Sequence, residues 1–278
     1  MKIEPRAEAA VKILSPGYRA LFERAAHVLG EEPAVRALWL SGSLARGDAD
    51  PFSDLDLLVA VADADFDTFA GRWQDWLARI TPTVIARALP FLPGSCYTLT
   101  PTCERLDVVS ERVSRLPQSI FRTRVVVFDK DGLDAQVPAP SPPAKPDRAK
   151  VETAIEEPLR YLALFPAMLG RGEFMLGQEG YGHMRRRISE LFLELNAPLP
   201  TTGVKHWRDK LTAEQYAVLE ALPWPAATRE ALIDANRVIA RALVEHGRPI
   251  AEKLGVRWPE ELEAAVRAQL KRELDFEF

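Results

Sequence analysis

The sequence has 278 residues, of which 47% are hydrophobic and 27% charged, and its formal net charge is −4. This composition is that of a soluble globular protein, and the length predicts two domains that can each bury a core. The acidic balance argues against a nucleic acid partner, because binding a phosphate backbone requires a basic face. We find neither a signal peptide nor an apolar stretch long enough to span a bilayer, which predicts a cytoplasmic location and no membrane partner.

A helix and two strands are predicted first along the chain. Residues 16–31 show helical periodicity, with Ser15 placed to cap the helix and Pro16 at its first position. The apolar run at residues 35–41 predicts a first strand, and the run at residues 54–61 predicts a second. The candidate chemistry lies in the turn between these strands and at the start of the second.

Two aspartates open the second predicted strand. Asp54 and Asp56 share one face, because side chains alternate along a strand. Carboxylates this close repel each other unless a cation lies between them, so the pair predicts a metal site. Oxygen ligands favour Mg²⁺, which completes its coordination with waters and the phosphates of a nucleoside triphosphate. Gly42 and Ser43 fit this site, because glycine lets the backbone approach a phosphate and the following helix start offers N–H groups and a hydroxyl.

These four residues resemble the signature of the polymerase-β-type nucleotidyltransferase superfamily, which is Gly-Ser followed on the next strand by Asp-x-Asp. The resemblance implies that Asp54 and Asp56 hold Mg²⁺ on the triphosphate and that Gly42 and Ser43 bind the nucleotide. It also implies a third carboxylate on a later strand.

Between residues 64 and 128 the sequence pattern predicts one more helix and further strands around this site. Residues 64–80 have helical spacing and carry an aromatic stripe, which predicts packing against the sheet. Two strands are predicted at residues 83–89 and 95–100, and a strand that closes the sheet is predicted at residues 121–128. Cys96 and Cys103 lack metal-binding spacing, and we expect both to be small buried side chains.

The strand predicted at residues 103–110 supplies the third carboxylate that the resemblance implies. Asp107 lies in the middle of this strand between two apolar neighbours, where a carboxylate is costly unless it is bound to something. We therefore assign it to the metal site. Glu104 and Glu111 are alternatives, but Glu104 lies on the opposite face and Glu111 is expected past the end of the strand.

The composition changes at residues 136–147, QVPAPSPPAKPD, which are too rich in proline for a helix or an inner strand and predict a semi-rigid linker. We expect a nucleotidyltransferase domain at residues 1–135 and a helical substrate-binding domain at residues 148–278. Helical periodicity covers most of the second half, at residues 148–169, 174–195, 212–222, 226–246 and 259–274. The predicted fold class is therefore α+β, a mixed sheet flanked by helices and followed by an all-α bundle.

This architecture resembles that of the nucleotidyltransferases that adenylylate aminoglycosides or lincosamides. One segment of the second half, residues 203–216, is similar to a stretch in which a lysine reaches the triphosphate of ATP, and Lys205 would be that lysine. A solvent-facing lysine on a turn is an equal alternative.

The second half also contains Arg241 and His246, which fit the Arg-x4-His pattern of HEPN ribonucleases. At this spacing the two side chains lie about 140° apart around a helix, which is off a single face. The pattern favours an alternative function, that of a toxin–antitoxin-type protein whose nucleotidyltransferase and HEPN-like domains act on a protein or RNA.

The function that these observations favour is transfer of a nucleoside monophosphate, AMP from ATP, to a hydroxyl of a small-molecule acceptor. The reaction uses Mg²⁺ and releases pyrophosphate, and the acceptor is expected in a cleft between the two domains. In this interpretation Asp107 binds a second metal or removes the proton of the acceptor hydroxyl. The identity of the acceptor and the oligomeric state stay open.

Overall fold

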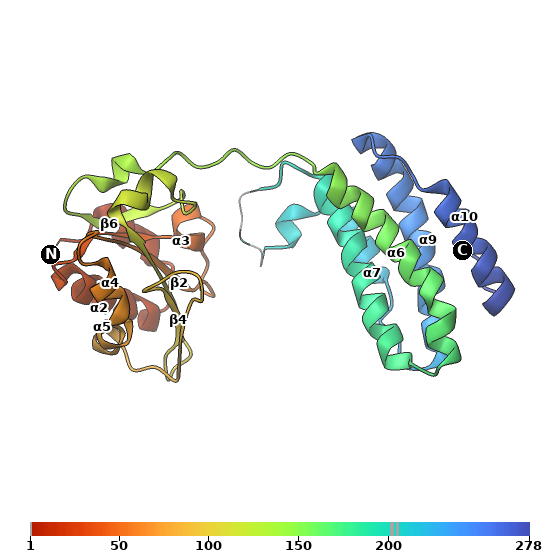
Figure 1. Ribbon diagram of the computed structural model, residues 1–278, viewed down its shortest axis with the longest axis horizontal. Helices are drawn as coiled ribbons and strands as arrows, with labels where there is room; N and C mark the ends of the chain where they lie inside the picture. The colour runs from red at the N-terminus through yellow and green to blue at the C-terminus, as the bar shows by residue number, and fades with distance from the viewer. Residues whose placement is uncertain (1, 201–202, 204–205) are drawn as a thin grey trace. The chain divides into compact units, whose positions relative to one another are not determined.

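The computed structural model of the protein describes residues 2–200, 203 and 206–278. The chain forms two compact units (Figure 1). The sheet unit contains the described residues up to Pro142 together with Gly203, and the helical unit contains residues 143–200 and 206–278. The division falls inside the proline-rich segment. Within the described ranges, no helix combines the length and the apolarity needed to cross a membrane.

A mixed six-stranded sheet forms the centre of the sheet unit, with the strand order β3-β4-β5-β2-β1-β6. Strands β2 and β5 run parallel, and the other neighbouring pairs are antiparallel. The strands are β1 (Val35–Leu40), β2 (Leu55–Val61), β3 (Ile85–Ala88), β4 (Cys96–Leu99), β5 (Arg105–Arg112) and β6 (Val125–Asp129). The α+β prediction is confirmed.

Short and medium helices surround this sheet. They are α1 (Pro5–Val11), α2 (Pro16–Glu31), α3 (Gly42–Arg46), α4 (Phe66–Gly71), α5 (Trp73–Ile80) and the 3₁₀ turns η1 (Val113–Gln118) and η2 (Leu133–Gln136). The predicted cap of α2 is present, because the Ser15 hydroxyl accepts the backbone N–H of Tyr18 at 3.4 Å.

The two faces of the sheet have separate cores. One face packs against α1, α2, α4 and α5 through residues such as Leu57 of β2 and Val108 of β5. The other face carries Trp39 and Leu58, which pack under Leu116 of η1 and a leucine of η2. This second core covers only part of its face, and the polar ends of β2 and β5 lie on that same face.

One helix was predicted where the structure has two. The helical spacing of residues 64–80 is interrupted at Arg72, whose φ of −101° and ψ of 24° separate α4 from α5. The break allows the rings of Phe69 and Trp76 to stack at 5.3 Å between centroids, and both rings are buried. Stacked burial of two aromatic rings outweighs the loss of a helical turn.

The two cysteines differ in environment, so the expectation that both are buried is wrong for Cys103. Cys96 lies inside β4, and burial raises the pKa of its thiol to about 12, which keeps it protonated. Cys103 is exposed, because it occupies the turn before β5 with a φ of 65°.

The helical unit is a bundle of long helices with two short elements (Figure 1). Its elements are α6 (Arg148–Gly170), α7 (Phe174–Leu195), η3 (Arg208–Lys210), α8 (Ala213–Ala221), α9 (Arg229–Leu254) and α10 (Glu260–Leu274). Helix α6 packs against α7, α9 and α10 around one apolar core. Helix α8 begins with a capping box, in which Thr212 and Gln215 are the two partners.

Helix α9 is longer than predicted, since it continues eight residues past His246 to Leu254. Gly247 and Pro249, which follow the predicted end at residue 246, both lie inside the helix. A Cβ at Gly247 would lie 3.0 Å from the ring of Trp258, so this glycine makes room for a tryptophan packed against the helix. Tertiary packing therefore overrides the low helix propensity of Gly247.

Candidate active site

Asp56 and Asp107 lie opposite each other on neighbouring parallel strands. The register of β2 and β5 pairs their Cα atoms, and neighbouring strands lie about 4.8 Å apart. The buried Leu55 and Leu106 point to the opposite face, which places both aspartates on the face of Trp39 and Leu58. Two carboxylates from separate strands therefore share one end of the sheet, as the alternation of residues predicts.

Asp54 lies immediately before β2 and forms an ion pair with Arg105, the first residue of β5. Nη2 of Arg105 lies 3.0 Å from Oδ2 of Asp54. The backbone N–H of Arg105 also donates to the hydroxyl of Tyr18 at 3.0 Å, which ties β5 to α2. A guanidinium therefore already balances one of the two predicted metal-binding carboxylates. Arg105 was not among the residues predicted for the site.

Gly42 makes the turn from β1 into α3 directly against Asp56. Its φ is +58°, a conformation that favours glycine, and a Cβ built there would lie 1.9 Å from Oδ2 of Asp56. The hydroxyl of the neighbouring Ser43 is buried and has no hydrogen-bond partner among the described residues. A buried hydroxyl without a partner is costly, and a bound ligand oxygen would satisfy it.

The same turn contains an ion pair that the sequence interpretation did not use. Nε of Arg46, in α3, lies 3.2 Å from Oδ1 of Asp48, just past the helix. Helix α3 and the two residues after it therefore form a compact segment that carries a cation, Arg46, and a carboxylate, Asp48. The spacing of Arg46 and Asp48, two positions apart in the sequence, could have indicated this ion pair.

Neither alternative for the third carboxylate lies near Asp56. Glu104 accepts hydrogen bonds from Thr100 and Thr102, which hold the pKa of its carboxyl below the ordinary value. Glu111 was expected past the strand end, but it lies inside β5 on the face of Asp107, so that expectation is wrong. It lies four positions after Asp107, which is about 13 Å along a strand.

Glu111 instead belongs to a buried polar network further along β5. It accepts the hydroxyl of Ser119 at 2.9 Å and lies 3.8 Å from Arg124, whose side chain is only 3% exposed. The guanidinium of Arg124 lies 4.6 Å from the ring centroid of Trp39, and Trp39 donates its indole N–H to Asp134 at 2.8 Å. These contacts explain why a carboxylate is tolerated there, and they indicate a structural role.

Asp107 and Glu111 therefore provide a matched pair of substitutions on one strand. We expect Asp107→Asn to reduce nucleotidyl transfer by roughly a hundredfold, as is typical of a lost acid–base group, with little change in melting temperature. We expect Glu111→Gln to lower the melting temperature and leave the rate within a few-fold, because it disturbs a buried network. Rate assays and thermal melts of both variants test this, and the reverse pattern would move the third carboxylate to Glu111.

The residues at this end of the sheet fit a bound magnesium nucleotide only in part. No set of three or more His, Cys, Asp or Glu side chains is arranged to hold a metal ion in the part of the chain that the structure describes. Mg²⁺ is commonly held by one or two carboxylates together with waters and substrate phosphates. Asp54, Asp56 and the unpartnered hydroxyl of Ser43 are consistent with that arrangement.

Two residues assigned from sequence lie elsewhere. Lys205, the predicted nucleotide-binding lysine, lies outside the described residues. Arg241 and His246 both lie on α9, where Arg241 is exposed and the ring of His246 packs edge-on against Phe192, with 5.7 Å between centroids. This aromatic contact accounts for His246 without a ribonuclease site.

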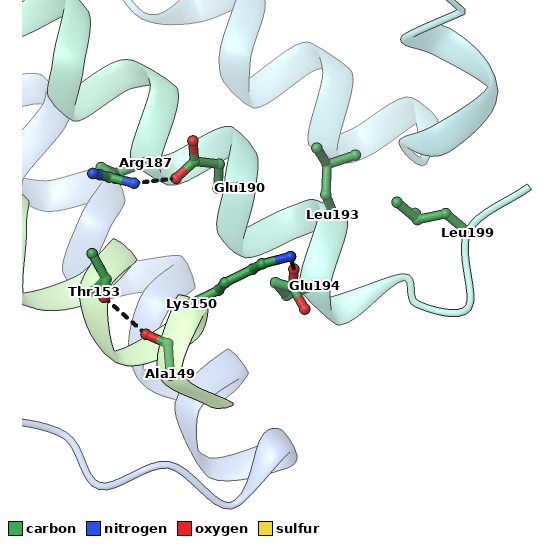
Figure 2. Close-up of a pocket in the computed structure, with 8 residues that line it drawn as sticks. All are labelled: Ala149, Lys150, Thr153, Arg187, Glu190, Leu193, Glu194 and Leu199. Carbon is green, nitrogen blue, oxygen red and sulfur yellow. Dashed lines mark hydrogen bonds and ion pairs between the residues drawn. The ribbon is translucent and has the colours of Figure 1, made fainter. Parts of the chain in front are cut away.

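The helical unit contains a pocket of about 590 Å³ between the start of α6 and the end of α7. Figure 2 shows Arg187 turned toward Glu190 and Lys150 reaching toward Glu194. The first pair is 2.7 Å apart and the second 3.9 Å. The lining residues are Ala149, Lys150, Thr153, Arg187, Glu190, Leu193, Glu194 and Leu199. A pocket of this size, lined by four charged residues, three apolar residues and a threonine, suits a small molecule with polar groups.

Comparison with known proteins supports the catalytic interpretation of the sheet unit. Residues 23–90 match the model of the nucleotidyltransferase domain family. This range includes β1, the Gly42–Ser43 turn and the aspartates that open β2. The sheet unit therefore carries a nucleotidyltransferase domain of the polymerase-β type. The chain is an enzyme that transfers nucleotidyl groups.

Similarities to solved structures are weaker. An aminoglycoside 6-adenyltransferase from Bacillus subtilis is 13% identical with a TM-score of 0.43, over 91% of this chain and 95% of that one. A CCA-adding enzyme in complex with CTP is 12% identical with a TM-score of 0.39, over 98% and 73%. At these scores neither similarity supports an argument about the acceptor. None of the curated proteins matches the sequence.

Proposed function

We propose that the enzyme transfers AMP from ATP to a hydroxyl of a small-molecule acceptor, such as an aminoglycoside or lincosamide antibiotic, and releases pyrophosphate. The observation that carries the proposal is the placement of Asp56, which lies against the Gly42 turn and opposite Asp107. Carboxylates, a close backbone approach and a buried hydroxyl with no hydrogen-bond partner among the described residues are consistent with binding of a magnesium nucleotide.

Each residue has a role in this reaction. Asp54 and Asp56 would hold Mg²⁺, which when bound neutralises charge on the triphosphate. The Gly42 backbone and the Ser43 hydroxyl would bind phosphate oxygens. Asp107 would accept the proton of the acceptor hydroxyl while that oxygen attacks the α-phosphorus and the bond to pyrophosphate breaks. The catalytic contribution of the chain is then mainly positioning and charge stabilisation.

The ion pair between Arg105 and Asp54 affects how a cation would bind at this site. This pair balances charge at the site without a metal, so a bound cation must compete with the guanidinium for Asp54. When Asp54 binds the cation, the Arg105 guanidinium is released to pair with a phosphate, which it binds well. The half-exposed position of Arg105 leaves it room to move.

Equilibrium binding of ATP tests the nucleotide site directly. We expect Mg²⁺ to strengthen binding by roughly tenfold or more, which corresponds to ~1.4 kcal/mol. The Asp54→Asn, Asp56→Asn double variant should lose this enhancement, because its carboxylates no longer hold the cation. Equal ATP affinity with and without Mg²⁺ in the unsubstituted enzyme would contradict the assignment of these two residues to a metal.

The acceptor is proposed to bind in the pocket between α6 and α7, because its 590 Å³ and mixed lining suit a hydroxylated small molecule. We expect Leu193→Trp to fill the pocket and raise the KM for the acceptor roughly tenfold, with the KM for ATP unchanged. Leu164→Trp, at a half-exposed position of α6 outside the pocket, is the control. An unchanged acceptor KM in the Leu193 variant would exclude this pocket.

A further inference from the structure

A second cavity in the helical unit is built from arginine and tryptophan. It measures about 280 Å³ and lies along one face of α7, where Gly182, Arg185, Arg186 and Ser189 recur at helical spacing. Trp207, the residue before η3, and Trp224, between α8 and α9, complete its lining. None of these residues belongs to the candidate active site or to the pocket of Figure 2.

The two tryptophans are unusually accessible for residues of their size. Trp224 is 68% exposed and Trp207 is 40% exposed. Indole faces left open beside a cavity are costly in water and are good stacking platforms for planar rings. A Cβ at Gly182 would lie 3.8 Å from the ring of Trp224, so the glycine leaves room for the cavity beside this indole.

Arg185 is held in place with part of its hydrogen-bonding capacity unused. Its Nη2 donates to the carbonyl of Leu219 at 2.7 Å, and its guanidinium carbon lies 4.9 Å from the ring centroid of Trp224. Its Nε is buried and finds no hydrogen-bond partner in the described parts of the chain. A guanidinium fixed on two sides with a buried donor unsatisfied is a pre-organised site for an acceptor atom.

Arg186 adds a second positive charge at the rim. It is exposed, and no carboxylate pairs with it within the ranges that the structure describes. Ser189, which also lines the cavity, directs its hydroxyl to the carbonyl of Arg186 at 2.7 Å and adds no negative charge. The cavity therefore presents two cations and two aromatic faces with no acidic lining residue.

We propose that this cavity is a binding site for a planar aromatic ligand that carries a negative charge, of the class of a nucleoside monophosphate. The ring stacks on Trp224 or Trp207, and the anionic group pairs with Arg185 and Arg186. The site is distinct from the triphosphate site of the proposed function, since it lies wholly in the helical unit and involves none of the three aspartates.

Tryptophan fluorescence of the full-length protein without Mg²⁺ tests this proposal. AMP is the probe, and adenosine and ribose 5-phosphate are probes that each lack one of the two required features. We expect saturable quenching by AMP and binding of the other two that is weaker by roughly tenfold or more. Equal binding of adenosine and AMP, or no saturable quenching by AMP up to millimolar concentration, would overturn the proposal.

Substitutions locate the site. Arg186→Gln changes an exposed residue and should not impair folding, and we expect it to weaken AMP binding roughly tenfold. Arg171→Gln, also exposed in the helical unit, is the matched control and should leave AMP binding unchanged. The Asp54→Asn, Asp56→Asn double variant should bind AMP as tightly as the unsubstituted protein. Loss of AMP binding in that double variant, or binding of an oligoadenylate but not of AMP, would refute the site.

Discussion

Replacing Asp56 by asparagine is expected to reduce nucleotidyl transfer by roughly a thousandfold or more while the protein stays folded. A metal ion supplies several kcal/mol of charge stabilisation, and each ~1.4 kcal/mol corresponds to a factor of ten in rate. Asn keeps the shape of the side chain against Gly42 but removes the charge that holds a cation. Steady-state kinetics and a thermal melt of the same preparation measure both parts of the expectation.

Asp75→Asn serves as the control, because Asp75 is an exposed residue of α5 on the opposite side of the sheet from Asp56. It makes the same chemical change without touching the site, and its rate should equal that of the unsubstituted enzyme. Comparable turnover in the Asp56 variant would remove this residue from the catalytic site. A rate loss accompanied by unfolding would instead indicate a structural role for Asp56.

Substitution of Gly42 by alanine is the second large expected effect. A Cβ at 1.9 Å from Oδ2 of Asp56 must displace either the carboxylate or the turn, so we expect transfer to fall by roughly a hundredfold or more. The positive φ of +58° adds a backbone cost of about 1–2 kcal/mol, which a melt should detect. Kinetic assays separate displacement of the Asp56 carboxylate from backbone strain when this variant is compared with an alanine variant of a second glycine in the same segment.

Gly47 is that second glycine. It caps the end of α3 with a φ of +83°, but a Cβ there would meet nothing within 4 Å. Gly47→Ala should therefore lose a similar amount of stability and keep its rate within a few-fold. If both variants lose activity equally, strain in the turn is the cause, and the contact between Gly42 and Asp56 has no separate role in catalysis.

The central arrangement of the sheet could be predicted because strand periodicity alone decides which residues share a face. That rule placed Asp107 on the polar face and Leu106 in the core, and the structure agrees with both. It could not supply the register of β2 against β5, which depends on packing between strands distant in sequence. For the same reason the pairing of Arg105 with Asp54 was not predicted.

Other differences arise where tertiary packing overrides local signals. Residues around Arg72 kept a helical period, but burial of Phe69 and Trp76 as a stacked pair required a break. Gly247 resembled a helix end, but it lies inside α9 because Trp258 packs against it. The cavity beside Trp224 was also beyond sequence reasoning, since its lining comes from α7 and from two connecting segments.

The most direct test of the proposed function is to incubate the enzyme with Mg²⁺ and each α-labelled nucleoside triphosphate, together with a panel of acceptors. The panel contains aminoglycosides, lincosamides, toxin proteins and RNA, and Asp56→Asn serves as the inactive control. We expect label from ATP to become attached to a small molecule, with release of one pyrophosphate for each transfer. Transfer of the label only to a protein or to RNA would contradict the small-molecule acceptor, and no transfer from any nucleotide would contradict the site itself.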